Sequence, residues 1–291
     1  MARTVAALNS KGGVGKTTTL ANLGGLYADM GLRVLMLDAD IQPSLTKYYP
    51  LTYEAPAGLV EVIHQGTVTS QCISRTNISN LDLIRSNDGE AQLQHWLHGR
   101  PDSRSRLARA LNNPYVEEHY DLVLIDTQGA IGPLQTAAAF AADLLVSPLP
   151  PDTPSVREFR SGTLRVLHRL EQDENEPRPQ LAPIRAVIVK FDHSRDGRHL
   201  LRELQQEFDA GDRVSILNTV IPDSVAYKEA FSQRRPVHIG NKMGGARYAS
   251  PFEVMHRLAW ELIPELRGQF AGRLKGDPDE VFGTSTAGGV A

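Results

Sequence analysis

A glycine-rich segment between a short apolar run and a helical pattern constrains this chain more than any other feature. The segment reads Gly-Gly-Val-Gly-Lys-Thr from Gly12 to Thr17 and follows the strand-like run Thr4–Leu8. Glycines let successive backbone N–H groups turn inward, and the helix that follows presents its positive end to the same point. In such a loop Lys16 reaches the β- and γ-phosphates of a nucleotide, and the Thr17 hydroxyl binds Mg²⁺. The sequence therefore predicts a triphosphate site near the N-terminus.

Apolar runs and helical patterns alternate along most of the chain. The runs predicted to be strands are Thr4–Leu8, Val34–Leu37, Leu81–Arg85, Leu122–Ile125, Leu144–Val146, Ala186–Val189 and Val214–Leu217. The helical patterns are Lys16–Met30, most of the segment between Arg85 and Leu111, Ser155–Leu170, Gly197–Phe208 and Pro251–Leu266. This alternation is typical of an α/β fold, a doubly wound and mostly parallel sheet with helices on both faces. We expect one P-loop domain over residues 1–270.

The remaining segments are polar. The run Gln172–Pro183 is rich in Pro, Glu and Asn and is predicted to be an exposed loop. Residues 271–291 contain Gly, Ser, Thr and Ala with few large apolar side chains, so we expect a disordered tail.

Composition excludes several classes of protein. Lys and Arg total 31 against 34 for Asp and Glu, a net charge of −3, which argues against bulk charge coating of DNA but leaves room for a basic patch. The single cysteine, Cys72, excludes an internal disulfide, a zinc ribbon and any cluster that needs several thiolates from one chain. No stretch approaches the roughly 20 apolar residues of a membrane span, and the N-terminus lacks a signal-peptide core. We expect a cytoplasmic protein without a membrane partner.

Two carboxylates at predicted strand ends complete the site. Transfer of a phosphoryl group to water needs a metal to offset charge and a group to orient the water. Asp126 follows the run Leu122–Ile125 and is suited to the Mg²⁺ shell, while Gly129 can offer an unobstructed backbone N–H to the γ-phosphate. Asp40 follows Val34–Leu37. The alternatives are a loop-capping acid for Asp126 and a solvated turn acid for Asp40.

The residues before the glycine loop make the signal more specific. Ser10 stands where the ordinary motif has its first glycine, and Lys11 precedes Gly12. The segment resembles the deviant Walker A motif, KGGxGK[ST], of the ParA/MinD superfamily, in which the first lysine reaches the partner's nucleotide across a dimer interface. Lys11 matches that lysine. The nucleotide-binding residues that the motif and the resemblance imply are Gly12, Gly13, Val14, Gly15, Lys16, Thr17, Thr18, Gly129, Lys190, Phe191 and Pro222.

The switch motifs of the family are also similar, with departures. Asp38–Gln42 resembles the D-x-D-P-Q switch I with Ile41 in place of proline, and Asp126–Gly129 resembles switch II with Gln128 where many relatives have proline. By this resemblance Asp40 assists hydrolysis through the water or the metal shell, and we expect Asp38 to support the loop by hydrogen bonds. The implied catalytic residues are Lys11, Lys16, Asp40 and Asp126, and the implied metal residues are Thr17, Asp40 and Asp126.

Weaker similarities continue to about Leu266. Val187–Asp192 looks like the family strand that leads to the adenine pocket. Family-like elements follow in order at Ile221-Pro222-Asp223, Glu229-Ala230, Arg235-Pro236 and Gly245–Tyr248. Lys190, Phe191 and Pro222 are candidate adenine neighbours, and core packing is the alternative for them.

The resemblance implies a slow ATPase that forms a homodimer with ATP and Mg²⁺, closest to the Soj-like partition ATPases. Its expected partners are non-specific double-stranded DNA and a ParB-like centromere-binding or adaptor protein that stimulates hydrolysis. It would be associated with the nucleoid and would segregate or position a plasmid, a chromosome or an integrated element. Because the motif starts within about ten residues of Met1, we expect no N-terminal helix-turn-helix.

DNA binding of this kind needs clustered cations that face phosphates. Asp223 replaces the arginine that the family has after Ile-Pro, so the DNA contacts must differ in part from those of relatives. The alternative is a solvated charged surface. The candidate DNA contacts are Arg195, Arg198 and Arg202 in one group and Arg234, Arg235, Lys242 and Arg247 in another.

Two other functions are weighed against this one. A membrane-cycling MinD-like ATPase would need a terminal amphipathic helix, and Pro251–Phe270 carries an apolar stripe that we interpret as core packing. A metabolic P-loop synthetase would transfer phosphate to a small molecule, but Lys11 favours a shared dimer interface.

Overall fold

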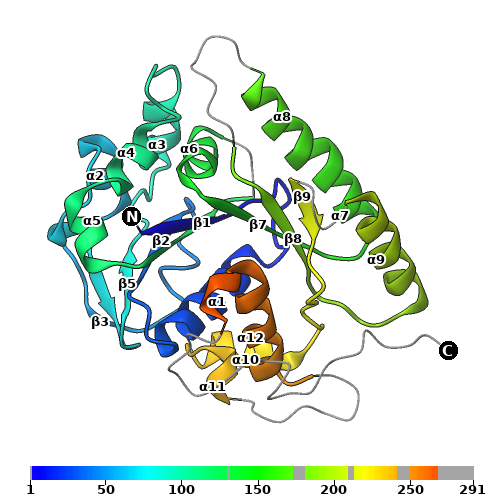
Figure 1. The fold of residues 1–291 in the computed structure, drawn as a ribbon. Helices are drawn as coiled ribbons and strands as arrows, with labels where there is room; N and C mark the ends of the chain where they lie inside the picture. The colour runs from blue at the N-terminus through cyan, green and yellow to red at the C-terminus, as the bar shows by residue number, and fades with distance from the viewer. Residues whose placement is uncertain (1, 130–131, 173–180, 209–212, 241–248, 268–291) are drawn as a thin grey trace.

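The structure is a computed structural model, and it describes residues 2–129, 132–172, 181–208, 213–240 and 249–267. These residues form a nine-stranded sheet with helices on both faces (Figure 1). The α/β fold class predicted from the alternating pattern is therefore confirmed. The predicted end of the domain at residue 270 and the predicted tail, residues 271–291, lie outside the described residues.

The sheet is parallel except at one edge. In spatial order its strands are β3 (Leu51–Tyr53), β4 (Ser74–Thr76), β5 (Leu81–Ile84), β2 (Val34–Ala39), β6 (Leu122–Thr127), β1 (Arg3–Ala7), β7 (Leu144–Leu149), β8 (Ile184–Ile188) and β9 (Val214–Ile216). Strand β4 pairs antiparallel with both β3 and β5. The central strand β1 lies between β6 and β7, so the loop that follows it opens at the carboxyl edge of the parallel strands, where α/β sheets bind ligands.

Side chains on alternate positions of each strand enter two separate hydrophobic cores, as expected of a sheet buried on both faces. Val5 and Val34 belong to one core, while their neighbours Ala6 and Leu35 belong to the other. The first core lies under α1 (Lys16–Asp29), α10 (Val225–Ser232), α11 (Val237–Gly240) and α12 (Pro251–Leu262).

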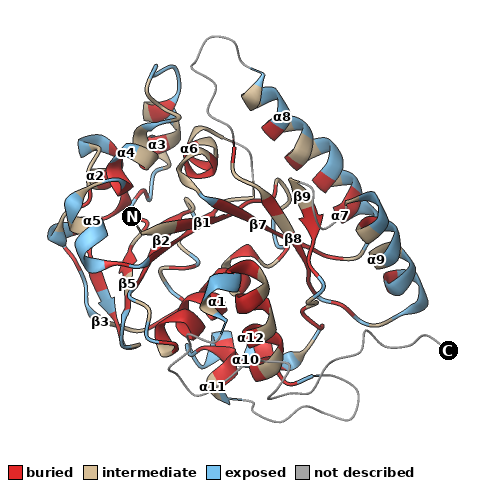
Figure 2. Cartoon of the chain, viewed as in Figure 1, coloured by how far each residue is buried: buried red, intermediate tan, exposed pale blue. Residues whose placement is uncertain are grey.

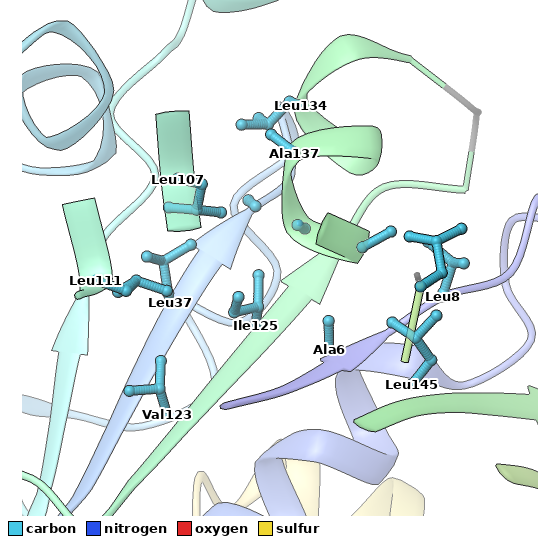
Figure 3. Close-up of a cluster of buried hydrophobic side chains, with 14 of the residues drawn as sticks. Ala6, Leu8, Leu37, Leu107, Leu111, Val123, Ile125, Leu134, Ala137 and Leu145 are labelled. Atoms are coloured by element: carbon cyan, nitrogen blue, oxygen red, sulfur yellow. The ribbon is translucent and has the colours of Figure 1, made fainter. Parts of the chain in front are cut away.

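The second core lies on the opposite face, and Figure 3 shows part of it between the sheet and helices α4 and α6. Its helices are α2 (Leu59–Gln65), α3 (Gln92–Leu97), α4 (Arg106–Leu111), α5 (Pro114–His119), α6 (Pro133–Ala141), α7 (Thr153–Glu158), α8 (Arg165–Glu171) and α9 (Arg195–Glu207). A π-helical segment, Phe159–Leu164, joins α7 to α8, so that residues 153–171 form one long helix. Two short 3₁₀ segments are Ser70–Cys72 and Pro264–Leu266.

Sequence reasoning missed the antiparallel edge, one helix break and the helices α2, α5, α6, α10 and α11. Strands β3 and β4 have only three residues each, too few to show an alternating pattern. The segment up to Leu111 was expected to be mostly helical, but it divides into α3 and α4. Gly99, with φ 77°, ends the first helix, and Pro101 follows it.

Helix α12 packs in the core, as the sequence predicted. Its apolar stripe, Phe252, Val254, Met255, Leu258 and Leu262, is buried in the first core against α1 and α11. Figure 2 shows much of α12 coloured as buried. The Tyr27 hydroxyl of α1 donates a hydrogen bond to the carbonyl of Ala259, at 3.1 Å. No helix in the described ranges is long and apolar enough to span a lipid bilayer.

Candidate nucleotide site

The glycine loop joins β1 to α1 and adopts a conformation that only glycine takes readily. Gly13 and Gly15 have φ values of 70° and 98°, in the left-handed region, and Gly15 caps the start of α1. A Cβ atom built on Gly12, Gly13 or Gly15 meets nothing within 4 Å. These positions therefore border open space, and the loop has room for a ligand beside its backbone.

Lys16 points back into the loop. Its side chain is buried, and its Nζ donates hydrogen bonds to the carbonyls of Asn9 and Lys11 at 3.3 and 3.2 Å. Burial lowers the pKa of Lys16, and the nearby carboxylates of Asp126 and Asp40 oppose that shift. The ammonium thus lies within the loop and close to both acids that the sequence assigned to the site.

Asp126 and Asp38 lie side by side at the carboxyl ends of β6 and β2, where they are register partners. Both are fully buried. Burial, and secondarily the charge of Asp38, raises the pKa of Asp126 to about 8. Burial also raises the pKa of Asp38 to about 6, despite two hydrogen bonds from Thr46.

The oxygens at this point suit Mg²⁺. The Thr17 hydroxyl donates to Asp126 Oδ2 at 2.6 Å, while Asp126 Oδ1 is buried and has no hydrogen-bond partner among the described residues. A hydroxyl and a carboxylate oxygen whose lone pairs accept no hydrogen bond are the hard oxygen ligands that Mg²⁺ takes beside phosphates. Thr17 and Asp126 would hold the ion, which when bound would offset the negative charge of the phosphates.

A cavity of about 830 Å³ opens beside the glycine loop. This volume lies within the range of small-molecule sites. Its wall includes Asp40, Gly129, Lys190, Pro222 and Phe231. Residues at the ends of β2, β6 and β8, together with residues of α10, thus surround one space, and each predicted switch segment contributes to it.

Gly129 lies directly against the loop. A Cβ atom on Gly129 would lie 2.6 Å from the Cα and 2.7 Å from the N of Gly12, closer than such atoms can approach. Only glycine fits there without moving the loop backbone.

The candidate adenine neighbours divide into two kinds. Lys190 has a left-handed φ of 56°, and its Nζ donates to the carbonyl of Gly13 at 2.9 Å. Pro222 forms a bridge with Phe191, and Lys190 and Pro222 both line the cavity. Phe191 is buried in the second core and is not among the lining residues. The adenine contacts stay predictions.

Lys11 is held on the outer side of the loop by its own chain. Its Nζ donates to Ser155 Oγ at 2.8 Å and lies 3.7 Å from Asp152 Oδ1. Its side chain is 39% exposed. The lysine is therefore near solvent at the start of α7, outside the loop that Lys16 fills.

Several supporting residues were missed by sequence reasoning. Asn9 is buried, its side-chain amide donates to the carbonyl of Pro148, and its Oδ1 accepts from the Lys11 N–H. The Ser10 hydroxyl donates to Glu158 at 2.7 Å. The polar pair Asn9-Ser10, between a buried strand and the glycine loop, could have indicated residues that support the loop. No local pattern indicates Glu158, because only folding brings it near Ser10.

The candidate DNA contacts lie in separate places. Arg195, Arg198 and Arg202 are exposed on α9, beside β9. Arg234 donates to the carbonyl of Tyr49, and Arg235 is exposed just before α11. Figure 1 shows α9 and α11 well apart. Lys242 and Arg247, like the Gly245–Tyr248 element, lie outside the described residues.

The strand–loop–helix unit, its buried lysine and the paired acids define a P-loop nucleotide-binding protein. The AAA domain family model matches residues 2–178. The sporulation initiation inhibitor protein Soj of Bacillus subtilis is 29% identical over 240 residues, which cover 81% of this chain and 90% of Soj.

Two solved structures extend the match. An ATP complex of Cyanothece McdA has a TM-score of 0.73 at 25% identity and covers 88% of this chain and 96% of its own. Cobyrinic acid a,c-diamide synthase from Mycobacterium smegmatis, with ADP and magnesium, has a TM-score of 0.66 at 27% identity and covers 80% and 92%. The chain thus belongs to the AAA domain family and is a ParA-like member of the ParA/MinD superfamily of ATPases. ATP and Mg²⁺ are confirmed as the ligands expected for the site.

Proposed function

We propose that this chain is a partition ATPase that dimerises with ATP, binds double-stranded DNA without sequence preference and hydrolyses ATP slowly. A ParB-like or adaptor protein would stimulate hydrolysis and so drive segregation or positioning of a plasmid, a chromosome or an integrated element. Its similarity to the chromosome-partitioning ATPase Soj of Thermus thermophilus, 29% identical over 268 residues, supports a role in partition.

The position of Lys11 carries the proposal. Lys16 already occupies the interior of the loop, so a second lysine is not needed there by the same protomer. Lys11 instead lies half-exposed and is held by Ser155 and Asp152. An exposed ion pair contributes only about 0–1 kcal/mol, so the phosphates of a partner's nucleotide can displace this contact.

Dimerisation is tested by light scattering after gel filtration with a non-hydrolysable ATP analogue and Mg²⁺. We expect a dimer with the analogue and a monomer with ADP. Lys11→Ala should weaken dimerisation and hydrolysis while nucleotide binding persists. Lys16→Ala should abolish dimerisation and hydrolysis. Arg75→Ala, on strand β4 next to the far edge of the sheet, is the control. A Lys11→Ala protein that dimerises and hydrolyses ATP normally would refute the trans role.

Helix α9 is a better supported candidate for the DNA surface than the group that contains Arg234 and Arg235. Arg195, Arg198 and Arg202 recur at three- and four-residue spacing and are all exposed, so they share a face. The helix also carries three acids. Glu203 pairs with His199 and Glu207 pairs with Arg160, while Asp196 is exposed in the first turn.

Fluorescence anisotropy on a random-sequence duplex, with ATP against ADP and across a salt series, tests this surface. Replacing the three α9 arginines by alanine should weaken ATP-dependent binding. Each lost phosphate contact should reduce the slope of log K against log salt by about 0.9. The matched control replaces three exposed arginines elsewhere, Arg75, Arg100 and Arg109. Equal loss in both triple variants would show that only net charge matters.

The two alternatives have direct tests. A MinD-like membrane cycle predicts flotation with anionic vesicles in the presence of ATP, and burial of the α12 stripe argues against that helix as the anchor. A synthetase predicts conversion of a carboxylate substrate with stoichiometric ADP release. The match to the diamide synthase keeps this alternative open, while similarity to the chromosome-partitioning ATPase Soj of Thermus thermophilus favours partition.

A further inference from the structure

The segment that carries Asp40 is closed by a ring of hydrogen bonds. Asp38 is fully buried at the end of β2, and its Oδ2 accepts bonds from both the N–H and the hydroxyl of Thr46, each at 2.7 Å. Its Oδ1 accepts from the Asp40 N–H at 3.3 Å. One carboxylate therefore holds both ends of the segment from residue 40 to residue 46.

The end of the neighbouring strand closes the ring. Ser86 follows β5, and its hydroxyl donates to the carbonyl of Asp40 at 2.6 Å. The Ser86 N–H donates to the Thr46 hydroxyl oxygen at 3.1 Å. The Thr46 hydroxyl thus accepts one bond and donates another, and the ring runs from Asp38 through Thr46 and Ser86 to Asp40 and back.

This ring holds the Asp40 backbone from both sides. Its N–H is bonded to Asp38 and its C=O to Ser86, while the side-chain Oδ1 accepts from the Gln42 N–H at 3.0 Å. Ile41 stands where a proline would limit the backbone, so the chain lacks that restraint here. Ser86 is 8% exposed and Asp38 is fully buried, so water does not compete freely for these bonds.

We propose that Ser86 and Thr46 are positioning residues, which hold the backbone of Asp40 so that its carboxylate faces the nucleotide cavity. The inference rests on the proposed role of Asp40 in hydrolysis. A displacement of about 1 Å in a reacting group can cost about 100-fold in rate, so bonds to the Asp40 peptide affect catalysis without touching the nucleotide.

Paired substitutions separate positioning from general stability. Thr46→Val keeps the shape of the side chain but removes the hydroxyl, and Thr46→Ser keeps the hydroxyl. Ser86→Ala removes the donor to Asp40. Thr52→Val is the matched control, because the Thr52 hydroxyl donates to the Thr76 carbonyl on the antiparallel edge, away from the site.

The measurements are single-turnover ATP hydrolysis, nucleotide Kd and melting temperature. We expect Ser86→Ala and Thr46→Val to lower the rate of hydrolysis about 10- to 100-fold with Kd almost unchanged. Thr46→Ser should retain most of the rate, and Thr52→Val should retain all of it. In an Asp40→Ala background, Ser86→Ala should have no further effect on the rate, because coupled residues are not additive.

Three outcomes would overturn the inference. Normal hydrolysis by both Ser86→Ala and Thr46→Val, with Asp40→Ala inactive, would show that the ring does not position Asp40. Equal losses in Thr46→Val and Thr46→Ser, or an additive loss in the double variant, would show a purely structural role. Normal hydrolysis by Asp40→Ala itself would instead remove the proposed catalytic role on which the inference rests.

Discussion

At the scale of single residues, buried charge dominates the site. Asp126 and Asp38 are adjacent and buried, and no basic side chain within the described ranges forms an ion pair with either of them, although the charge of Lys16 acts on Asp126. Burial and a neighbouring like charge both disfavour the ionised form of Asp126, the form that would hold a metal ion. The nucleotide-free protein should therefore carry a stability penalty at these residues.

The melting temperature of Asp126→Asn relative to the wild type should depend on pH and so reveal that penalty. The pKa of Asp126 is about 8 in the folded protein against an ordinary value of 3.8, so the folded state keeps a proton that the unfolded chain releases. This contribution to stability is present at low pH and falls as pH rises from about 4 to about 8. We expect the variant to melt above the wild type at pH 8.5 and close to it at pH 4, while losing hydrolysis.

Thermal unfolding without nucleotide at both pH values checks this prediction. Each kcal/mol of removed penalty should raise Tm by about 2–4 °C in a chain of this size. Glu117→Gln, at an exposed acid on α5, is the control. A Tm difference independent of pH would contradict the assignment to Asp126.

Gly129→Ala should disturb the phosphate loop. The added Cβ would overlap the backbone of Gly12, so the segment after β6 must move away from the glycine loop. We expect nucleotide affinity to fall at least 10-fold by titration calorimetry. Gly89→Ala, where a Cβ meets nothing within 4 Å, should bind normally. Wild-type affinity in the Gly129 variant would show that the contact is dispensable.

At the scale of secondary structure, strand ends decide where the chemistry lies. The alternation of apolar runs and helices was sufficient to predict the central parallel strands and α1, because long buried elements leave strong patterns. It could not reveal β3, β4 or the break between α3 and α4. Those features depend on three-residue pairings and on Gly99, which a pattern search does not resolve.

Leu258→Ala tests the packing of α12 in the first core. Leu258 is fully buried in the first core, so the variant should lose about 2–5 kcal/mol of unfolding free energy in urea. Val225→Ala, at a position 64% exposed, should change it by less than about 0.5 kcal/mol. A small effect at Leu258 would indicate that α12 is not a core element.

At the scale of the whole molecule, nucleotide binding and association should be linked. A ligand that binds only the folded state adds about 2.7 kcal/mol at 100 times its Kd, and a dimer makes stability depend on protein concentration. With a non-hydrolysable ATP analogue and Mg²⁺, we expect Tm to rise with protein concentration. With ADP it should not. Scanning fluorimetry over a 100-fold concentration range checks this, and equal behaviour with both nucleotides would contradict ATP-dependent dimerisation.

The sequence by itself determined the phosphate loop, the acids at the strand ends and the α/β class. These features are local: a glycine turn, a lysine and a threonine lie within six residues, and buried strands have a recognisable composition. Only the tertiary structure decided which distant side chains hold them. Ser86 reaches Asp40, Glu158 reaches Ser10 and Ser155 reaches Lys11 because parallel strands and one long helix bring their ends together, and no local pattern encodes such contacts.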